Sequence, residues 1–111
     1  AAKANLVISR LTSERPGFIP SLVLCELVWV LRSTYKIAKS DCVAVLEQVL
    51  ATVDFQGEHV ELCHKALKSY AEGGADFSDY VIREVAFASG CDRVLTFDQK
   101  ALKEAGFALP G

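Results

Sequence analysis

Apolar residues recur at helical spacing along most of the chain. The spacing predicts helices over residues 3–13, 22–35, 58–72 and 76–89, and another that is capped by Ser40. Gly73-Gly74 ends the helix over 58–72. The helix over 22–35, with Ser21 as its N-cap, is apolar on nearly all sides, so we expect it to be buried. The residues expected to face inward are Val43, Leu46, Val49 and Leu50 in the helix capped by Ser40. In the helix over 58–72 they are Val60, Cys63, Leu67 and Tyr70.

Short strands are expected between these helices. The clearest covers residues 93–97, and briefer ones are expected at 18–19, 53–55 and 107–109. Asp98 follows the clearest strand and precedes a short helix over 99–105, which ends at Gly106. Because no hairpin signal joins the strands, the pattern predicts an α/β fold with a parallel sheet.

The composition fits a single packed domain covering residues 1–111. Apolar residues make up 51% of the chain and charged residues 23%, a balance that argues against intrinsic disorder. The longest apolar run, residues 22–31, is interrupted by Glu26 and is too short to cross a bilayer, and the sequence shows no signal peptide. We therefore expect a cytoplasmic protein that does not act at a membrane.

Cysteine and histidine do not suggest a metal site. Cys25, Cys42, Cys63 and Cys91 form no C-x-x-C pair, so we expect buried, reduced thiols. The two histidines are five residues apart, which places them on different helix faces, and we expect no zinc site.

The net charge of −2 argues against general electrostatic adhesion to nucleic acid. It leaves a nuclease possible, because a carboxylate-rich site contributes negative charge and bound metal ions can bridge it to phosphate. Candidate contacts to RNA phosphates, each of which also fits a solvated surface, are Arg32, Lys36, Lys39, Lys100 and Lys103.

Glu26 is the most unusual acidic residue. Its neighbours three and four positions away are Leu22, Val23, Trp29 and Val30, none of which can pair with it. A carboxylate on a buried apolar face costs several kcal/mol unless something compensates for the lost water. Two interpretations are open: a distant salt bridge or partial exposure, and a metal ligand or catalytic acid.

Three aspartates have both a structural and a chemical interpretation. Asp76 and Asp79 share a helix face, where Asp76 can act as N-cap and Asp79 can pair with Arg83. Asp98 can cap the helix that begins at Gln99, and it also lies at the carboxyl end of a strand, where ligands bind in open α/β sheets. Carboxylates that converge repel one another unless a cation such as Mg²⁺ or Mn²⁺ joins them. Such ions can promote cleavage of a phosphodiester bond.

Three blocks of the sequence resemble motifs of the VapC-like PIN-domain ribonuclease toxins. Residues 20–31 (PSLVLCELVWVL) are similar to the second block of that family, residues 75–82 (ADFSDYVI) to the third and residues 90–98 (GCDRVLTFD) to the fourth. The blocks occur in the same order with matching separation, and the resemblance covers essentially the whole chain. It implies a PIN-like fold, a parallel sheet with helices on both sides.

The resemblance also implies an activity. Members of the family are Mg²⁺- or Mn²⁺-dependent endoribonucleases, and many are toxins held inactive by a cognate antitoxin. By motif, Glu26, Asp79 and Asp98 correspond to catalytic, metal-binding acids, and Asp76 to an additional metal-binding acid. We expect an RNA substrate, an antitoxin partner and, because apolar helices lie near the start, a homodimer.

The start of the chain departs from the family pattern. The family begins with a central strand that carries an Asp-Thr-Asn-like motif, whose aspartate is a principal metal ligand. This chain opens at Ala1-Ala2-Lys3 in what resembles the first helix. We expect a longer parent protein, and a fragment that is inactive or poorly folded unless another segment or chain supplies the strand.

Three hypotheses about function are therefore open. The first is a metal-dependent endoribonuclease of a toxin–antitoxin system. The second is a catalytically inactive PIN-like module that serves in binding or interaction. The third is a helical domain whose acids are solvated surface residues.

Overall fold

A computed structural model describes residues 21–52 and 60–111 of the chain. The helix expected over 3–13 and the strands expected at 18–19 and 53–55 lie outside the described residues. The chain divides into two compact units, residues 1–60 and 61–111. No helix within the described residues is long and apolar enough to cross a bilayer.

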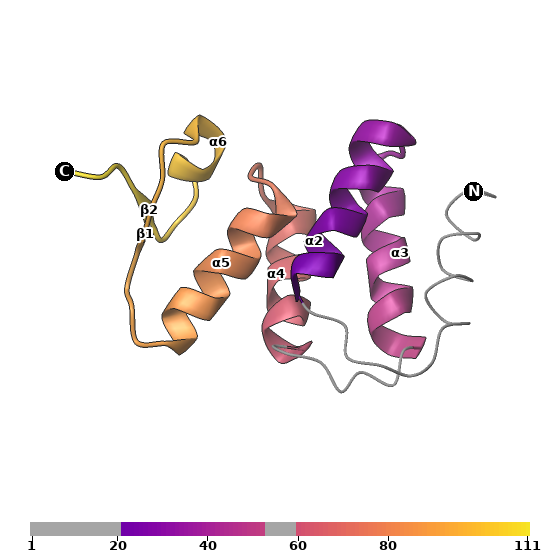
Figure 1. Ribbon diagram of the computed structural model, residues 1–111, viewed down its shortest axis with the longest axis horizontal. Helices are drawn as coiled ribbons and strands as arrows, with labels where there is room; N and C mark the ends of the chain where they lie inside the picture. Colours follow the sequence, from indigo (N-terminus) through magenta and orange to yellow (C-terminus); the bar gives the residue numbers. More distant parts are fainter. Residues whose placement is uncertain (1–20, 53–59) are drawn as a thin grey trace. The chain divides into compact units, whose positions relative to one another are not determined.

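Two helices form the described part of the first unit, α2 (Ser21–Trp29) and α3 (Lys39–Thr52) (Figure 1). α2 continues into a π-helical turn, η1 (Val30–Thr34), in which the amide of Tyr35 donates to the carbonyl of Val30, five residues back, at 3.1 Å. Lys36 then takes a left-handed conformation (φ 55°), which turns the chain toward α3. α3 begins one residue before Ser40, so Ser40 lies inside the helix and is not its cap.

The core of the first unit lies between α2, η1 and α3. Its most deeply buried side chains are those of Leu24, Leu31, Cys42, Leu46 and Val49. Three of the four residues of the stripe expected for α3 are buried: Leu46, Val49 and Leu50. Val43, which was expected inside, is half-buried because the buried face of the helix is centred nearer to Val45.

The expectation that the helix over 22–35 is buried on nearly all sides is wrong. Leu22 and Trp29 are each 67% exposed, and Glu26, which shares their face at helical spacing, is exposed as well. The Glu26 carboxylate therefore keeps its contact with water. The desolvation cost that made this residue unusual in the sequence does not arise here.

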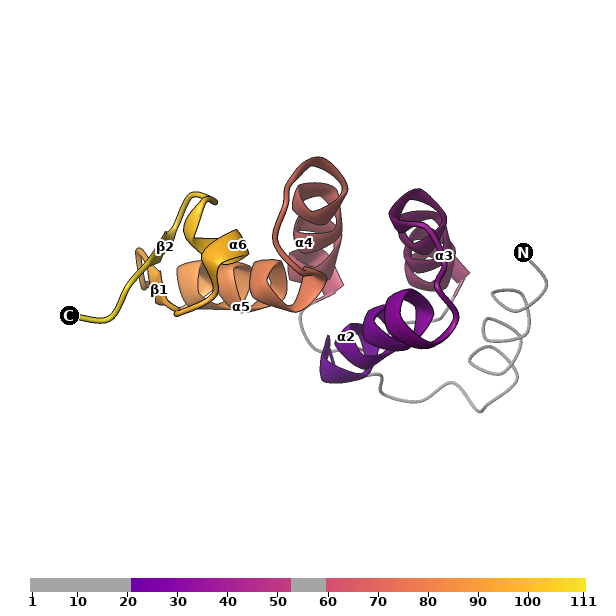
Figure 2. The ribbon, with the colours of Figure 1, turned by 90° about the horizontal axis from the view of Figure 1, so that it is seen from above.

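The second unit combines three helices with a small sheet. α4 (Val60–Glu72) packs on α5 (Phe77–Ala88) (Figure 2). At their contact the rings of Tyr70 and Phe77 meet edge to face, with centroids 5.9 Å apart. Strands β1 (Val94–Leu95) and β2 (Phe107–Ala108) pair in parallel, joined by α6 (Gln99–Leu102). The parallel α/β arrangement is confirmed, although β1 and α6 are shorter than the elements expected at 93–97 and 99–105.

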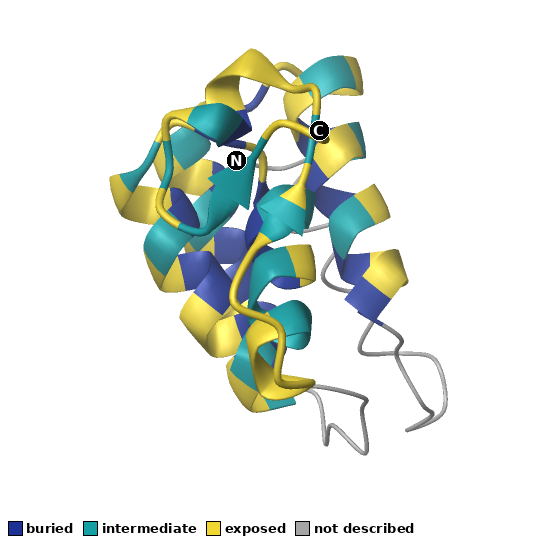
Figure 3. Ribbon diagram, turned by 90° about the vertical axis from the view of Figure 1, so that its left-hand side faces the viewer, coloured by how far each residue is buried: buried dark blue, intermediate teal, exposed yellow. Residues whose placement is uncertain are grey.

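Buried and exposed positions alternate around the helices, as expected of amphipathic segments (Figure 3). The inward residues of α4 are Cys63, Ala66, Leu67 and Tyr70, close to the expected stripe. The four cysteines form no disulfide with one another, and Cys42 and Cys63 are buried as expected. Burial raises the pKa of the Cys42 thiol to about 11. Cys91 is exposed, so the expectation of burial is wrong for that residue.

Candidate metal centre

Two aspartates lie at the start of α5. Asp76 is the N-cap residue and has extended backbone angles (φ −76°, ψ 155°), as expected from its place after the Gly73-Gly74 break. The Oδ2 atom of Asp79, three residues on, accepts a hydrogen bond from the backbone amide of Asp76 at 3.3 Å. This contact holds the Asp79 carboxylate against the first turn of the helix.

Asp98 is the N-cap of α6, as expected. Its Oδ1 atom accepts hydrogen bonds from the amides of Lys100 (2.8 Å) and Ala101 (3.1 Å). Its own amide donates to Oγ1 of Thr96 at 3.0 Å, which fixes the backbone just after β1. Both capping bonds use one carboxylate oxygen. Within the described residues, Oδ2 of Asp98 accepts no hydrogen bond and can serve as a ligand atom.

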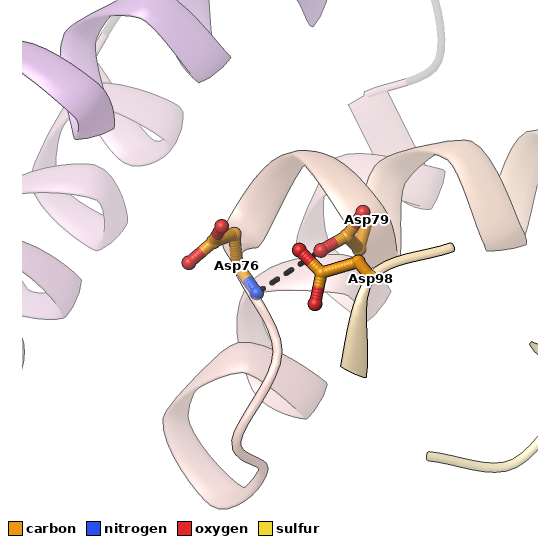
Figure 4. Close-up of side chains that lie close together, drawn as sticks. All are labelled: Asp76, Asp79 and Asp98. Atoms are coloured by element: carbon orange, nitrogen blue, oxygen red, sulfur yellow. Dashed lines mark hydrogen bonds between the residues drawn. The ribbon is translucent and has the colours of Figure 1, made fainter. Parts of the chain in front are cut away.

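The three aspartates converge although they come from two segments of the second unit, the start of α5 and the start of α6 (Figure 4). One carboxylate oxygen from each of Asp76, Asp79 and Asp98 lies within 4.8 Å of the other two. Asp79 is half-buried, whereas Asp76 and Asp98 are exposed. The cluster is therefore open to solvent on one side and bounded by the protein on the other.

The crowding of negative charge shows in the ionisation of Asp79. Partial burial is the largest cause that raises the pKa of this carboxyl above its usual value. The hydrogen bond from the Asp76 backbone lowers it, while the charges of Asp98 and Asp76 raise it further. A bound cation would relieve both the repulsion and the loss of hydration.

The pair expected between Asp79 and Arg83 does not form in the described structure. The Arg83 guanidinium donates instead to the backbone carbonyl of Ala105 and to Oγ of Ser69, each at 3.0 Å, and lies 3.4 Å from the Glu84 carboxylate. The prediction of an Asp79–Arg83 ion pair is therefore wrong. Among the residues that the structure describes, Asp79 has no basic partner, which favours the metal-ligand interpretation.

The donor set fits a hard divalent cation. Mg²⁺ takes oxygen ligands at about 2.0–2.1 Å in an octahedron, so two of its ligand oxygens lie about 3 to 4 Å apart. In the cluster the three carboxylate oxygens lie up to 4.8 Å apart, which is slightly wider than these distances. Small side-chain rotations would bring the oxygens to the spacing of an octahedral site. Carboxylate oxygens suit Mg²⁺ and Mn²⁺ better than softer metals.

Three of the four acids expected at the metal site are thus brought together. Glu26 lies on α2 in the first unit, so its place at the site remains a prediction.

Sequence reasoning missed the contact between Tyr80 and Glu104 beside Gly73, and it gave Arg83 a different partner. Gly73 was interpreted only as a helix stop, and Tyr80 and Glu104 meet through contacts that local spacing does not reveal.

Comparison with known proteins identifies the family. The family model of the PIN domain matches residues 2–108. Searches of curated proteins and of solved structures gave no match. PIN domains are typically nucleases, and those nucleases generally use divalent metals. The matched segment covers nearly all of the sequence, and the chain therefore belongs to the PIN domain family.

Proposed function

We propose that the protein is a Mg²⁺- or Mn²⁺-dependent endoribonuclease and the toxin of a toxin–antitoxin pair. The convergence of Asp76, Asp79 and Asp98 in a PIN domain is the observation that carries this proposal. The three VapC-like blocks support the narrower assignment to a toxin, and Glu26 enters as a fourth ligand through its place in the second block.

Asp79 and Asp98 each stabilise the fold with one carboxylate oxygen and can bind an ion with the other. Asp98 uses Oδ1 to cap α6, and Asp79 uses Oδ2 to accept the Asp76 amide, which leaves the other oxygen of each carboxylate for a ligand. Because these hydrogen bonds fix both side chains before an ion arrives, little ordering is required on binding. When bound, the ion supplies positive charge beside the scissile phosphate.

An RNA cleavage assay tests the proposal. Full-length protein would be incubated with RNA and Mn²⁺, and we expect cleavage that stops when EDTA is added. Asp79→Asn and Asp98→Asn should lower the rate by about 100-fold or more, since residues that only support a metal site already contribute 10- to 100-fold. Asp92→Asn is the matched control, because Asp92 is an exposed aspartate outside the cluster.

Glu26 has its own comparison. Glu26→Gln should lower the cleavage rate, whereas Glu47→Gln, which alters an exposed glutamate on α3 of the same unit, should not. Cleavage that persists in Asp79→Asn would refute the site. Metal binding without cleavage of any RNA would favour the alternative of an inactive PIN-like module.

The toxin role implies further behaviour. Induced expression of the protein in the cytoplasm should arrest growth, and the arrest should disappear in Asp79→Asn but persist in Asp92→Asn. We also expect a homodimer, which light scattering on the purified protein would detect. Growth that is unaffected by the active enzyme would refute the toxin role and leave the nuclease assignment standing.

A further inference from the structure

One hydrogen bond joins the two segments that carry the site aspartates. Tyr80, the neighbour of Asp79 on α5, donates its hydroxyl to the Glu104 carboxylate. Glu104 lies just beyond α6, the helix that Asp98 caps. The bond therefore ties the start of α5 to the far end of the short helix that holds Asp98.

Hydrogen bonds hold both Tyr80 and Glu104 close to the segments that carry the aspartates. Tyr80 is fully buried, and its hydroxyl also accepts the backbone amide of Ala75 at 3.2 Å. The amide of Glu104 donates to the carbonyl of Ala101 at 2.9 Å, which keeps Glu104 attached to α6. α6 itself is about 6 Å long, from a rise of 1.5 Å per residue over its four residues. A shift of Glu104 would therefore be passed on to Asp98.

Because Gly73 has no side chain, it leaves the space in which the Tyr80–Glu104 hydrogen bond forms. A Cβ atom at Gly73 would overlap both the Tyr80 hydroxyl and the Glu104 carboxylate, and it would lie 3.0 Å from the backbone carbonyl of Ser69. Gly74 is different, because a Cβ atom there would meet nothing within 4 Å. Neither glycine has a positive φ, so the close approach at Gly73 is what distinguishes them.

Arg83 supports the same connection from the next turn of α5. Its guanidinium lies 5.0 Å from the centre of the Tyr80 ring and donates to the carbonyl of Ala105, the residue after Glu104. The Tyr80–Glu104 and Arg83–Ala105 hydrogen bonds therefore both connect α5 to the segment after α6.

We infer that Gly73, Tyr80 and Glu104 form a clamp that sets the separation of Asp98 from Asp76 and Asp79, and with it the affinity of the cluster for a divalent cation. The inference rests on the proposed metal site. Tyr80 and Glu104 are positioning residues, since their polar groups bond to each other and act on the site through Asp79 and Asp98. Residues that orient metal ligands commonly contribute 10- to 100-fold to metal affinity.

The adjacent glycines give a matched pair for the test. Mn²⁺ affinity would be measured by calorimetric titration of the full-length protein. Gly73→Ala should raise the Kd about 10-fold, since its methyl group separates Tyr80 from Glu104. Gly74→Ala, with open space around its methyl group, should bind as the wild type does. Equal affinity in the two variants would overturn the clamp.

Three further variants separate positioning from general stability. Tyr80→Phe keeps the ring but loses the hydroxyl, and it should also raise the Kd about 10-fold. Glu104→Gln keeps an oxygen that accepts the tyrosine hydroxyl, so its affinity should stay close to that of the wild type. Val81→Ala removes methyl groups from a buried position of α5, and it should lower the melting temperature without changing the Kd. A Kd that follows melting temperature across these variants would overturn the inference.

A metal-free measurement distinguishes failure of the clamp from failure of the metal site. Hydrogen exchange without metal should be faster at the amides of Lys100 and Ala101, which bond to Asp98, in Gly73→Ala than in Gly74→Ala. A wild type that binds Mn²⁺ through Asp79, with Gly73→Ala binding equally well, overturns the clamp alone. A wild type that binds no Mn²⁺ overturns both the site and the clamp.

Discussion

At the scale of single residues, the site aspartates serve the fold and the chemistry together. Asp98 caps α6 and Asp79 closes the first turn of α5, and each keeps a carboxylate oxygen free of these bonds. Sequence alone identified Asp76 and Asp98 as helix caps, because capping depends on local position. It gave Asp79 the wrong partner, because the contacts that draw Arg83 to Ser69 and Ala105 come from distant parts of the chain.

Asp79→Asn should stabilise the metal-free protein near neutral pH. Folding raises the pKa of the Asp79 carboxyl. The contribution of this shift to folding stability is therefore fully present below the unfolded pKa of about 4, and it is lost as pH rises through the higher folded pKa. An uncharged amide avoids that loss. Thermal unfolding in EDTA at pH 7 should show a gain of up to about 1 kcal/mol, the scale of an exposed electrostatic interaction. Asp92→Asn should show none, and a lower melting temperature in Asp79→Asn would contradict the account.

Gly106 and Gly90 should respond differently to replacement by alanine. Both have a positive φ, 90° and 91°, so each substitution carries the backbone cost of about 1–2 kcal/mol. At Gly106 the added methyl group would also lie 2.7 Å from Cζ of Phe87 and 3.0 Å from Cδ of Arg83, while at Gly90 it meets nothing within 4 Å. Chemical denaturation should therefore show the larger loss for Gly106→Ala. Equal losses would mean that Phe87 and Arg83 move aside freely.

At the scale of elements, α5 organises the second unit. It carries Asp76 and Asp79 at its start, packs on α4 through Phe77, and contacts β1. The sequence predicted α5 and its cap closely because both a break at Gly73-Gly74 and an apolar period mark it. It predicted β1 and α6 as longer elements, since their ends are decided by the pairing of β1 with β2 and not by local propensity.

The exposed face of α2 shows where prediction from sequence pattern fails. An apolar composition on all sides indicated a buried helix, yet Leu22 and Trp29 are exposed. Periodicity reports which faces could be buried, and packing partners decide which of them are.

Arg83→Ala should loosen the attachment of α5 to its neighbours. The substitution removes hydrogen bonds to Ser69 and Ala105 and the stacking on Tyr80. Such losses add to roughly 2–3 kcal/mol of unfolding free energy. Denaturant titration would measure it, with Arg93→Ala, an exposed arginine of the same unit, as the control. A change below 0.5 kcal/mol (about the surface-substitution range) would contradict the role given to Arg83.

At the scale of the whole molecule, metal binding and folding should be linked. An ion that binds only the folded state stabilises it by about 2.7 kcal/mol at 100 times its Kd. Thermal unfolding should therefore show a Mn²⁺-dependent rise in melting temperature in the wild type and in Asp92→Asn, and none in Asp79→Asn. The rise should shrink as pH falls through the raised pKa of Asp79, because protons then compete with the ion. A rise that does not depend on Asp79 would place the ion elsewhere.

The family and the parallel α/β class were within reach of the sequence, because three motif blocks lie in order along the chain. The convergence of Asp98 with Asp76 and Asp79 was implied by motif and is seen in the second unit. That residues 1–111 form a single domain stays a prediction, as does the participation of Glu26, because both depend on more than local packing within one unit.

The central claim is that the three aspartates bind a divalent cation, and anomalous X-ray diffraction from crystals of the full-length protein grown with Mn²⁺ tests it most directly. We predict an anomalous peak between the carboxylates of Asp79 and Asp98, about 2 Å from an oxygen of each. The peak should vanish in Asp79→Asn crystals and remain in Asp92→Asn crystals. A well-occupied Mn²⁺ peak elsewhere, with none at these aspartates, would contradict the account.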